Sequence, residues 1–276
     1  MESAVIARER PAAPGAAAAA VSVTRVSKWF PTADGTRLQV LQDIDLEVAE
    51  HSIVAILGAS GCGKSTLLNI ISGILSPDEG RVSINGVPSA EFRDWRRVSY
   101  MFQEDRLLPW RTAVDNVRLP LELLGRDPGE QLARARAWLD RLGLGRFERA
   151  YPHELSGGMR QRVALARAFA VEPALLLADE AFGHLDEVTA AALRQTFVEL
   201  ARTEGNTAVL VTHQLEEAIE MGGRILVFGR PGRLLADINL RTWPAASVAS
   251  LRADIQRMLQ DNAADPRFAR AAEEHA

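Results

Sequence analysis

The feature that most constrains this chain is a glycine-rich stretch that fits a phosphate-binding pattern. Residues 58–66, GASGCGKST, match G-x-x-x-x-G-K-[ST] without a gap. The apolar run Ser52–Leu57 before them is typical of a strand buried on both faces of a parallel sheet. Apolar residues at helical spacing follow, from Leu67 to Ile74. The stretch therefore lies on a strand-to-helix turn, which is the context that a phosphate-binding loop requires.

The residue types of this loop suit an anionic ligand. The loop consists of Gly58, Ala59, Ser60, Gly61, Cys62, Gly63, Lys64, Ser65 and Thr66. We expect the three glycines to adopt positive φ, which turns backbone N–H groups inward beside the partial positive charge of the helix N-terminus. Lys64 would reach the β- and γ-phosphates, and the Ser65 hydroxyl would ligate Mg²⁺. A glycine-rich turn that binds nothing is the alternative, and the flanking strand and helix argue against it.

Composition limits the classes of function. With 276 residues, 47% hydrophobic and 25% charged, the chain is expected to be globular, with one large domain or one domain plus a subdomain. The net charge of −4 gives no general attraction to nucleic acid or anionic lipid. No apolar run reaches the ~18–20 residues that span a bilayer, so a membrane would be involved only through a partner.

The single cysteine lies inside the phosphate loop. Cys62 excludes internal disulfides and fits a reducing compartment. Its thiol could make the site sensitive to alkylation, or it could be a small side chain that fills space and points away from the ligand. We favour the second interpretation.

The first quarter of the chain indicates a tail and an antiparallel layer. Residues 1–20 are rich in alanine and proline and are expected to be disordered. From Val21 to about Arg97, four segments with period-two alternation predict strands beside the phosphate-binding strand: residues 22–26, 38–41, 44–48 and 81–84. The aromatic pair Trp29 and Phe30 precedes a proline. It could stack on a purine or merely cover the edge of the core.

A strand and a helical region follow. The strand Val98–Phe102 ends on Gln103. The apolar stretch Leu107–Trp110 contains a proline, so it is either a packed loop or an exposed docking surface. Residues 112–144 have a helical pattern, and their arginines lie among acidic residues, which is more typical of a solvated face than of a nucleic-acid patch.

Two further segments carry candidate site residues. Ser156 is a good N-cap, and Gly157 with Gly158 would expose backbone N–H groups at a helix N-terminus, forming a second anion-binding site. A buried strand then ends on Asp179 and Glu180, two carboxylates that are costly there unless they meet metal, water or a partner. We assign Asp179 to Mg²⁺ and Glu180 to the activation of water.

A third segment is the apolar strand of residues 208–212, which ends on His213. An isolated histidine would usually be a core or surface residue. This one ends a parallel strand, at the edge where such sheets bind ligands.

In this order, the motifs resemble the ATPase subunit of an ABC transporter. They are the phosphate loop, Gln103 after a strand, LSGGMRQR at 155–162, LLLADE at 175–180, GHLD at 183–186 and Thr212-His213. The resemblance covers about Val21 to Ala236. It implies an α/β fold: a P-loop NTPase (RecA-like) parallel-sheet core with an antiparallel β subdomain and an inserted helical subdomain at about 104–170. Residues 237–276 would form a short helical extension.

The resemblance also implies roles for single residues. Two cassettes would pair head to tail, so that ATP lies between the phosphate loop of one and Ser156, Gly157 and Gly158 of the other. Phe30 would stack on adenine, with Trp29 as the fallback. Gln103 would join Ser65 and Asp179 around Mg²⁺ and the attacking water, and Glu180 would act as general base. His213 would contact the γ-phosphate, and Asp186 would join the two subunits.

Within the family, two segments are similar to importers of the nitrate, sulfonate and taurine group: residues 102–110 and 151–155. This implies transmembrane permease subunits that dock near Leu108, Pro109 and Trp110, an extracytoplasmic solute-binding protein, and a peripheral location on the cytoplasmic face of the inner membrane. The solute would be small and anionic. Ala181, His184 and Gln214 depart from the family pattern, where proline, a small residue and aspartate are common.

The sequence disfavours two other classes of function. An exporter cassette is disfavoured by Leu108, Pro109 and Trp110. A cassette acting on nucleic acid or ribosomes is disfavoured because only about 90 residues separate the phosphate loop from the signature and the chain carries one cassette.

Overall fold

The main layer of the molecule is a six-stranded sheet. The structure, a computed structural model, describes residues 19–183, 185–240, 242 and 248–264. The strand order is β10-β9-β3-β8-β7-β6, parallel throughout except for the antiparallel β10. The strands are β3 (Ile53–Gly58), β6 (Val98–Met101), β7 (Leu175–Asp179), β8 (Thr207–Thr212), β9 (Arg224–Gly229) and β10 (Arg233–Asn239). The carboxyl ends of five parallel strands therefore meet at one edge, where such sheets bind ligands.

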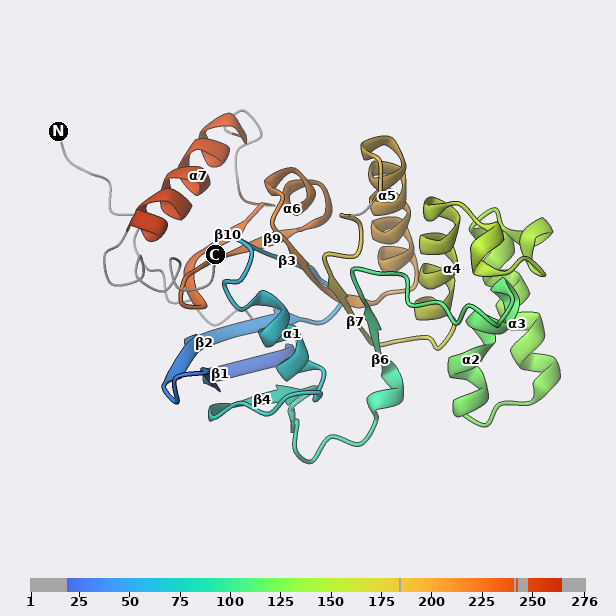
Figure 1. The fold of residues 1–276 in the computed structure, drawn as a ribbon, viewed down its shortest axis with the longest axis horizontal. Coiled ribbons are helices and arrows are strands. Elements are labelled where there is room, and N and C mark those ends of the chain that lie inside the picture. Colours follow the sequence, from blue (N-terminus) through green and yellow to red (C-terminus); the bar gives the residue numbers. More distant parts are fainter. Residues whose placement is uncertain (1–18, 184, 241, 243–247, 265–276) are drawn as a thin grey trace.

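A second, antiparallel sheet lies beside the first. Its order is β2-β1-β4-β5, with β1 (Ala19–Pro31), β2 (Arg37–Ala49), β4 (Glu79–Ile84) and β5 (Val87–Pro88). The helix after the phosphate loop, α1 (Lys64–Ile71), contacts strands of both sheets and lies between them in Figure 1. The predicted antiparallel layer beside the phosphate-binding strand is confirmed.

The helices fall into two groups. Three of them stand together at the right of Figure 1 and form the inserted helical region: α2 (Ala113–Leu123), α3 (Pro128–Arg141) and α4 (Gly157–Phe169). The others follow the core strands: α5 (Glu187–Thr203), α6 (Leu215–Met221) and α7 (Val248–Ala264). Single 3₁₀ turns occur at Trp95–Arg97, Gly145–Phe147 and Pro152–Glu154. Helices α5 and α6 and strand β10 were not predicted from the sequence.

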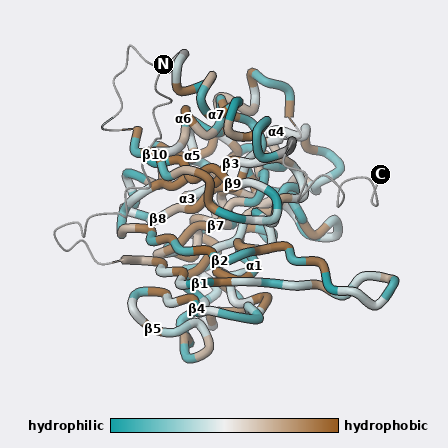
Figure 2. The backbone as a smooth tube through the Cα atoms, turned by 90° about the vertical axis from the view of Figure 1, so that its left-hand side faces the viewer, coloured by the Kyte–Doolittle hydropathy of each residue, from teal (hydrophilic) through white to brown (hydrophobic). Residues whose placement is uncertain are grey.

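Apolar strands form the centre of the molecule. Every residue of β3 is buried, as the continuous apolar run predicts. Figure 2 shows the hydrophobic segments gathered around β3, β7 and β9, with hydrophilic segments toward the outside. One hydrophobic cluster joins β7 and β8 to α2, α3 and α4, and it includes Trp138 and Phe169, whose ring centroids lie 5.5 Å apart.

The ends of the chain differ from the predicted boundaries. Residues 1–18 of the predicted tail lie outside the described residues, and Ala19 with Ala20 belongs to β1. β10 continues past Ala236, where we expected the cassette to end. α7 lies within the helical extension expected at residues 237–276, and it contacts β9. None of the described helices is long and apolar enough to cross a membrane.

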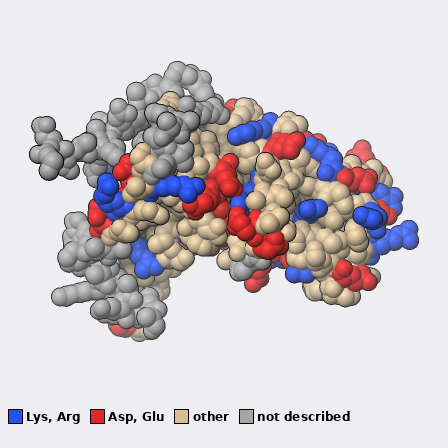
Figure 3. Space-filling model, turned by 90° about the horizontal axis from the view of Figure 1, so that it is seen from above, with Lys and Arg blue, Asp and Glu red and all other residues tan. Residues whose placement is uncertain are grey.

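The arginines of the helical region are largely paired with acids. Arg136 contacts Glu148, Arg141 contacts Glu204 and Arg134 contacts Glu172. On the face seen in Figure 3, basic side chains over this region stand among acidic ones. This agrees with the predicted solvated face.

Candidate nucleotide site

The phosphate loop joins β3 to α1, as predicted. Gly61 and Gly63 adopt positive φ, at 75° and 94°. Gly58 does not, so the prediction is wrong there. A Cβ at Gly58 would lie 2.7 Å from the Phe228 carbonyl oxygen and 2.8 Å from Cys62 Sγ. Glycine is needed at this position for space rather than for φ.

Cys62 is buried behind the loop, where its sulfur packs against Gly58. Burial raises the pKa of its thiol. This burial favours the interpretation that Cys62 fills space, which stays a prediction.

Lys64 is held over the loop by backbone oxygens. Its side chain is buried, and Nζ donates to the carbonyl oxygens of Gly58 at 2.8 Å and Ala59 at 3.0 Å. Nζ also lies 3.8 Å from Glu180 Oε1. An ammonium has three donors, so this geometry leaves one directed toward the acidic side of the site.

Both oxygens of Asp179 have a hydroxyl partner. Ser65 Oγ donates to Oδ1 at 2.8 Å, and the Tyr100 hydroxyl lies 3.2 Å from Oδ2. Burial raises the pKa of Asp179 above its usual range, although these hydrogen bonds oppose the shift. Sequence reasoning missed Tyr100. Its position on β6, the strand that pairs with β7, was the available signal.

Glu180 occupies a strained backbone conformation between Lys64 and His213. Its φ is 47°, a region that costs a non-glycine residue about 1–3 kcal/mol. The Glu180 N–H donates to the Val211 carbonyl at 3.0 Å, and Oε2 lies 3.1 Å from His213 Nδ1. Ala181, which stands where proline is common, is buried. Packing therefore holds this loop without the fixed φ of a proline.

Gln103 lies at the sheet edge that carries Asp179, whereas Trp29 and Phe30 belong to β1 of the antiparallel sheet. Gln103 follows β6 at the same edge as Asp179, with an exposed side chain, and its carbonyl oxygen accepts from Gln161 Nε2 at 3.3 Å. Phe30 is half-buried, with Lys28 Nζ 5.6 Å from its ring centroid, and Trp29 has the Arg37 guanidinium 5.4 Å from its ring.

The signature segment forms a second group. Ser156 caps α4, accepting from the Met159 N–H at 3.3 Å, which confirms the predicted N-cap. Asp186 caps α5 through the Thr189 N–H at 3.0 Å, and this hydrogen bond lowers the pKa of Asp186. A Cβ at Gly158 would lie 2.6 Å from Thr189 Cγ2. The N-termini of α4 and α5 thus lie together. His184 lies outside the described residues.

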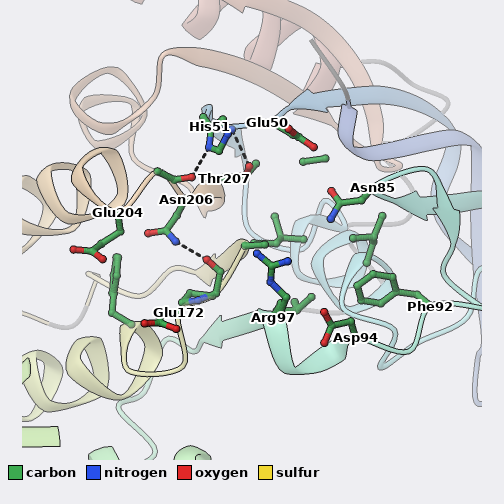
Figure 4. A pocket seen from close by; sticks show the side chains of 18 residues that line it. Glu50, His51, Asn85, Phe92, Asp94, Arg97, Glu172, Glu204, Asn206 and Thr207 are labelled. Carbon is green, nitrogen blue, oxygen red and sulfur yellow. Dashed lines mark hydrogen bonds between the residues drawn. The ribbon is translucent and has the colours of Figure 1, made fainter. Parts of the chain in front are cut away.

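A polar cavity of 430 Å³ lies at the opposite edge of the main sheet. It is bordered by the amino ends of β7 and β8, and Figure 4 shows His51, Arg97 and Thr207 around it. The His51 N–H donates to Thr207 Oγ1 at 3.0 Å. None of the predicted site residues lines this cavity.

The fold and the edge described above define a nucleotide-hydrolysing enzyme of the phosphate-loop class. Its phosphate loop follows the central strand, and a serine, an aspartate and a glutamate converge beside the loop lysine. The family model described as ABC transporter matches residues 41–183, and the chain belongs to this family. It is an ATP-binding cassette and an ATPase.

Similar proteins agree with this assignment. A taurine import ATP-binding protein from Rhizobium johnstonii is 41% identical over 221 residues, covering 80% of this chain and 84% of that protein. An aliphatic sulfonates import ATP-binding protein from Xanthomonas axonopodis pv. citri is 50% identical over 188 residues, covering 68% and 62%. A dimeric ATP-binding cassette in a post-hydrolysis state, bound to ADP and Pi, has a TM-score of 0.73 at 34% identity, covering 81% of this chain and all of that one.

Proposed function

We propose that this cassette is the ATP-hydrolysing subunit of a bacterial importer for a small anionic solute of the taurine or sulfonate kind. The observation that carries the proposal for the chemistry is the position of Glu180, whose two oxygens face Lys64 and His213. The solute class is supported by the taurine and sulfonate import relatives.

In the proposed reaction, Lys64 offsets charge on the β- and γ-phosphates, and Glu180 orients a water for in-line attack and accepts its proton. His213 needs a rearrangement or a proton before it can hold the γ-phosphate. While Nδ1–H donates to Glu180, Nε2 of a neutral ring can only accept, and a phosphate oxygen needs a donor. Nucleotide binding would therefore require one of two changes: the ring exchanges its contact with Glu180 for one to phosphate, or it gains a proton and donates to both.

The residues at the end of β7 fit Mg²⁺. The Ser65 hydroxyl and the Asp179 carboxylate are hard oxygen donors whose oxygens already lie 2.8 Å apart. With Gln103 at the same edge, these residues would hold the ion. When bound, Mg²⁺ would offset charge on the transferring phosphoryl group.

Two copies of the chain would complete the site. The signature residues Ser156, Gly157 and Gly158 lie with α5 at the N-terminus of α4, whereas Lys64 and Glu180 lie together at the strand ends. A head-to-tail dimer would bring the signature N–H groups of one copy to the phosphates held by the other. Asp186 would tie the copies together. Phe30 would stack on adenine.

The surface beside Gln103 supports docking of a membrane subunit. A mainly apolar groove of 540 Å³ is lined by β6, α2 and α4. Trp110 is 71% exposed at the end of the Leu108-Pro109-Trp110 segment, so the segment is not simply a packed loop. Tyr100 lines the groove and also reaches Asp179, which gives a docked partner a direct route to the nucleotide site.

We further propose that the chain works at the cytoplasmic face of the membrane with permease subunits and an extracytoplasmic solute-binding protein, and not with nucleic acid. Affinity purification of the tagged full-length chain should yield two-component membrane complexes with ATPase activity. Trp110→Ala should weaken the binding of the permease subunits at least tenfold, while the affinity for ATP stays within twofold of the wild type. Recovery of ribosomes or DNA instead, or an equal loss of ATP affinity, would contradict the proposal.

A further inference from the structure

Arg194 is a buried cation that the proposed chemistry does not use. It lies in the middle of α5 with 2% of its side chain exposed. All three of its nitrogens face carboxylates: Nε meets Glu220 at 2.9 Å, NH1 meets Glu217 at 3.3 Å and NH2 meets Glu187 at 2.8 Å. Glu187 belongs to the first turn of α5 itself, and the other two belong to α6. One guanidinium therefore joins the start of α5 to α6.

The contacts continue from Glu217 to the turn that carries His213. Glu217 Oε2 accepts from the Thr212 hydroxyl at 2.5 Å, and the same hydroxyl accepts from the Gln214 N–H at 3.0 Å. The residues on both sides of His213 are thus fixed through Glu217. Ala181, next to Glu180, lines the same small internal space as Thr212 and Glu217.

The exposed fractions of the three carboxylate side chains show that Glu217 is the buried partner of Arg194. The side chains of Glu187 and Glu220 are 74% and 52% exposed, whereas that of Glu217 is 6% exposed. A buried ion pair contributes little net stability compared with apolar residues of the same volume, but its loss leaves an uncompensated charge. What an arginine adds is a rigid planar fork that fixes several carboxylates in one geometry. The arrangement is therefore better explained by orientation than by stability.

The departure at Gln214 fits this explanation. Gln214 occupies the N-cap position of α6, but its side chain makes no capping hydrogen bond. An aspartate there could cap the helix itself. In this chain the turn is held instead by the Thr212 hydroxyl and by Glu217 in the first turn of α6.

The start of α5 lies where the second cassette is expected. Asp186 caps α5, and Thr189 packs beside Gly158 of the signature. We propose that Arg194 is a positioning residue that ties the start of α5 to the turn carrying His213, so that docking of the second cassette sets the histidine for hydrolysis. The proposal rests on the proposed function, because it requires a head-to-tail dimer and a histidine that contacts the γ-phosphate.

The test is Arg194→Lys in the full-length chain. Lysine keeps the charge, but a single ammonium cannot hold three carboxylates in the fork geometry. We expect kcat for ATP hydrolysis to fall at least tenfold, while the Kd for ATP stays within twofold and ATP still drives dimer formation. The matched control is Arg224→Lys, since Arg224 joins β9 to β10 through Asp237 at the other side of the sheet. It should leave kcat within twofold.

A second variant keeps the proposal testable if Arg194→Lys fails to fold. Glu187→Gln removes one exposed carboxylate that the Arg194 guanidinium holds. The variant should therefore fold normally and lower kcat about two- to fivefold without changing the Kd for ATP. Wild-type kcat in either folded variant would overturn the positioning role, as would a parallel loss of kcat and ATP affinity. A wild-type chain without ATPase activity would instead contradict the proposed function itself.

Discussion

The two parts of the proposed nucleotide site, one at the strand ends and one at the N-termini of α4 and α5, differ in how many of their contacts are already formed. At the strand ends, Glu180 contacts both Lys64 and His213, and Asp179 is hydrogen-bonded to Ser65 of the phosphate loop. At the N-termini of α4 and α5, the described contacts are caps and packing, and Ser156 is exposed. In the proposed function, one end is preorganised for chemistry, and the other would present its donors to the phosphates held by a second copy. Substitutions at the two ends should therefore fail in different ways.

The largest effect is expected at the strand ends. Glu180→Gln removes the proposed base but keeps the shape of the side chain, so hydrolysis should fall by about 10²–10⁴-fold. ATP affinity should be retained, and an ATP-bound dimer should accumulate in size-exclusion chromatography. The control is Glu204→Gln, because Glu204 borders the cavity at the opposite edge. Hydrolysis by Glu180→Gln at the wild-type rate would show that the base is another group.

The next effect concerns the signature. Gly158→Ala would place a Cβ 2.6 Å from Thr189 Cγ2. Overpacking of this kind costs about 1–3 kcal/mol, so we expect ATP hydrolysis to fall about tenfold or more while ATP binding by the monomer is unchanged. Adding Thr189→Ser removes Cγ2 and should restore part of the activity.

The neighbouring glycine provides the matched control. A Cβ at Gly157 would lie 3.6 Å from Leu185 Cδ2, an ordinary contact, so Gly157→Ala should be milder. Equal losses in the two variants, with no rescue by Thr189→Ser, would mean that packing at the signature does not control hydrolysis.

The same comparison explains what could be predicted from the sequence. The phosphate loop and the Ser156 cap depend on local residue types at fixed spacing, and both were predicted correctly. Contacts between segments that are distant in the sequence were not predicted. Tyr100 reaches Asp179 only because β6 pairs with β7, and Arg194 reaches Glu217 only because α5 packs on α6.

The backbone conformation of Gly58 also depends on a segment that is distant in the sequence. Its role depends on the Phe228 carbonyl of a neighbouring strand, which no local pattern reveals, so its φ was mispredicted.

The smallest expected effect is on thermal stability, and it concerns two aspartates whose pKa values are shifted in opposite directions. The pKa of Asp179 is raised by burial, whereas that of Asp186 is lowered by its hydrogen bond to the Thr189 N–H. Because the folded chain holds the Asp179 proton more tightly than the unfolded chain does, stability falls as pH rises from the usual carboxyl range through the folded-state pKa. At neutral pH the Asp179 carboxylate thus destabilises the nucleotide-free fold, while the Asp186 carboxylate stabilises it.

Replacing these carboxylates by amides should shift the melting temperature in opposite directions. Without nucleotide, Asp179→Asn should melt higher than the wild type, by about 2–4 °C for each ~1 kcal/mol of relieved charge burial. Asp186→Asn should melt no higher than the wild type. Adding Mg²⁺ and ATP should raise the melting temperature of the wild type more than that of Asp179→Asn, since the carboxylate would then be paired with the ion. If Asp179→Asn melts lower than the wild type without nucleotide, Asp179 contributes to stability there, and the strand ends are not held ready for a cation.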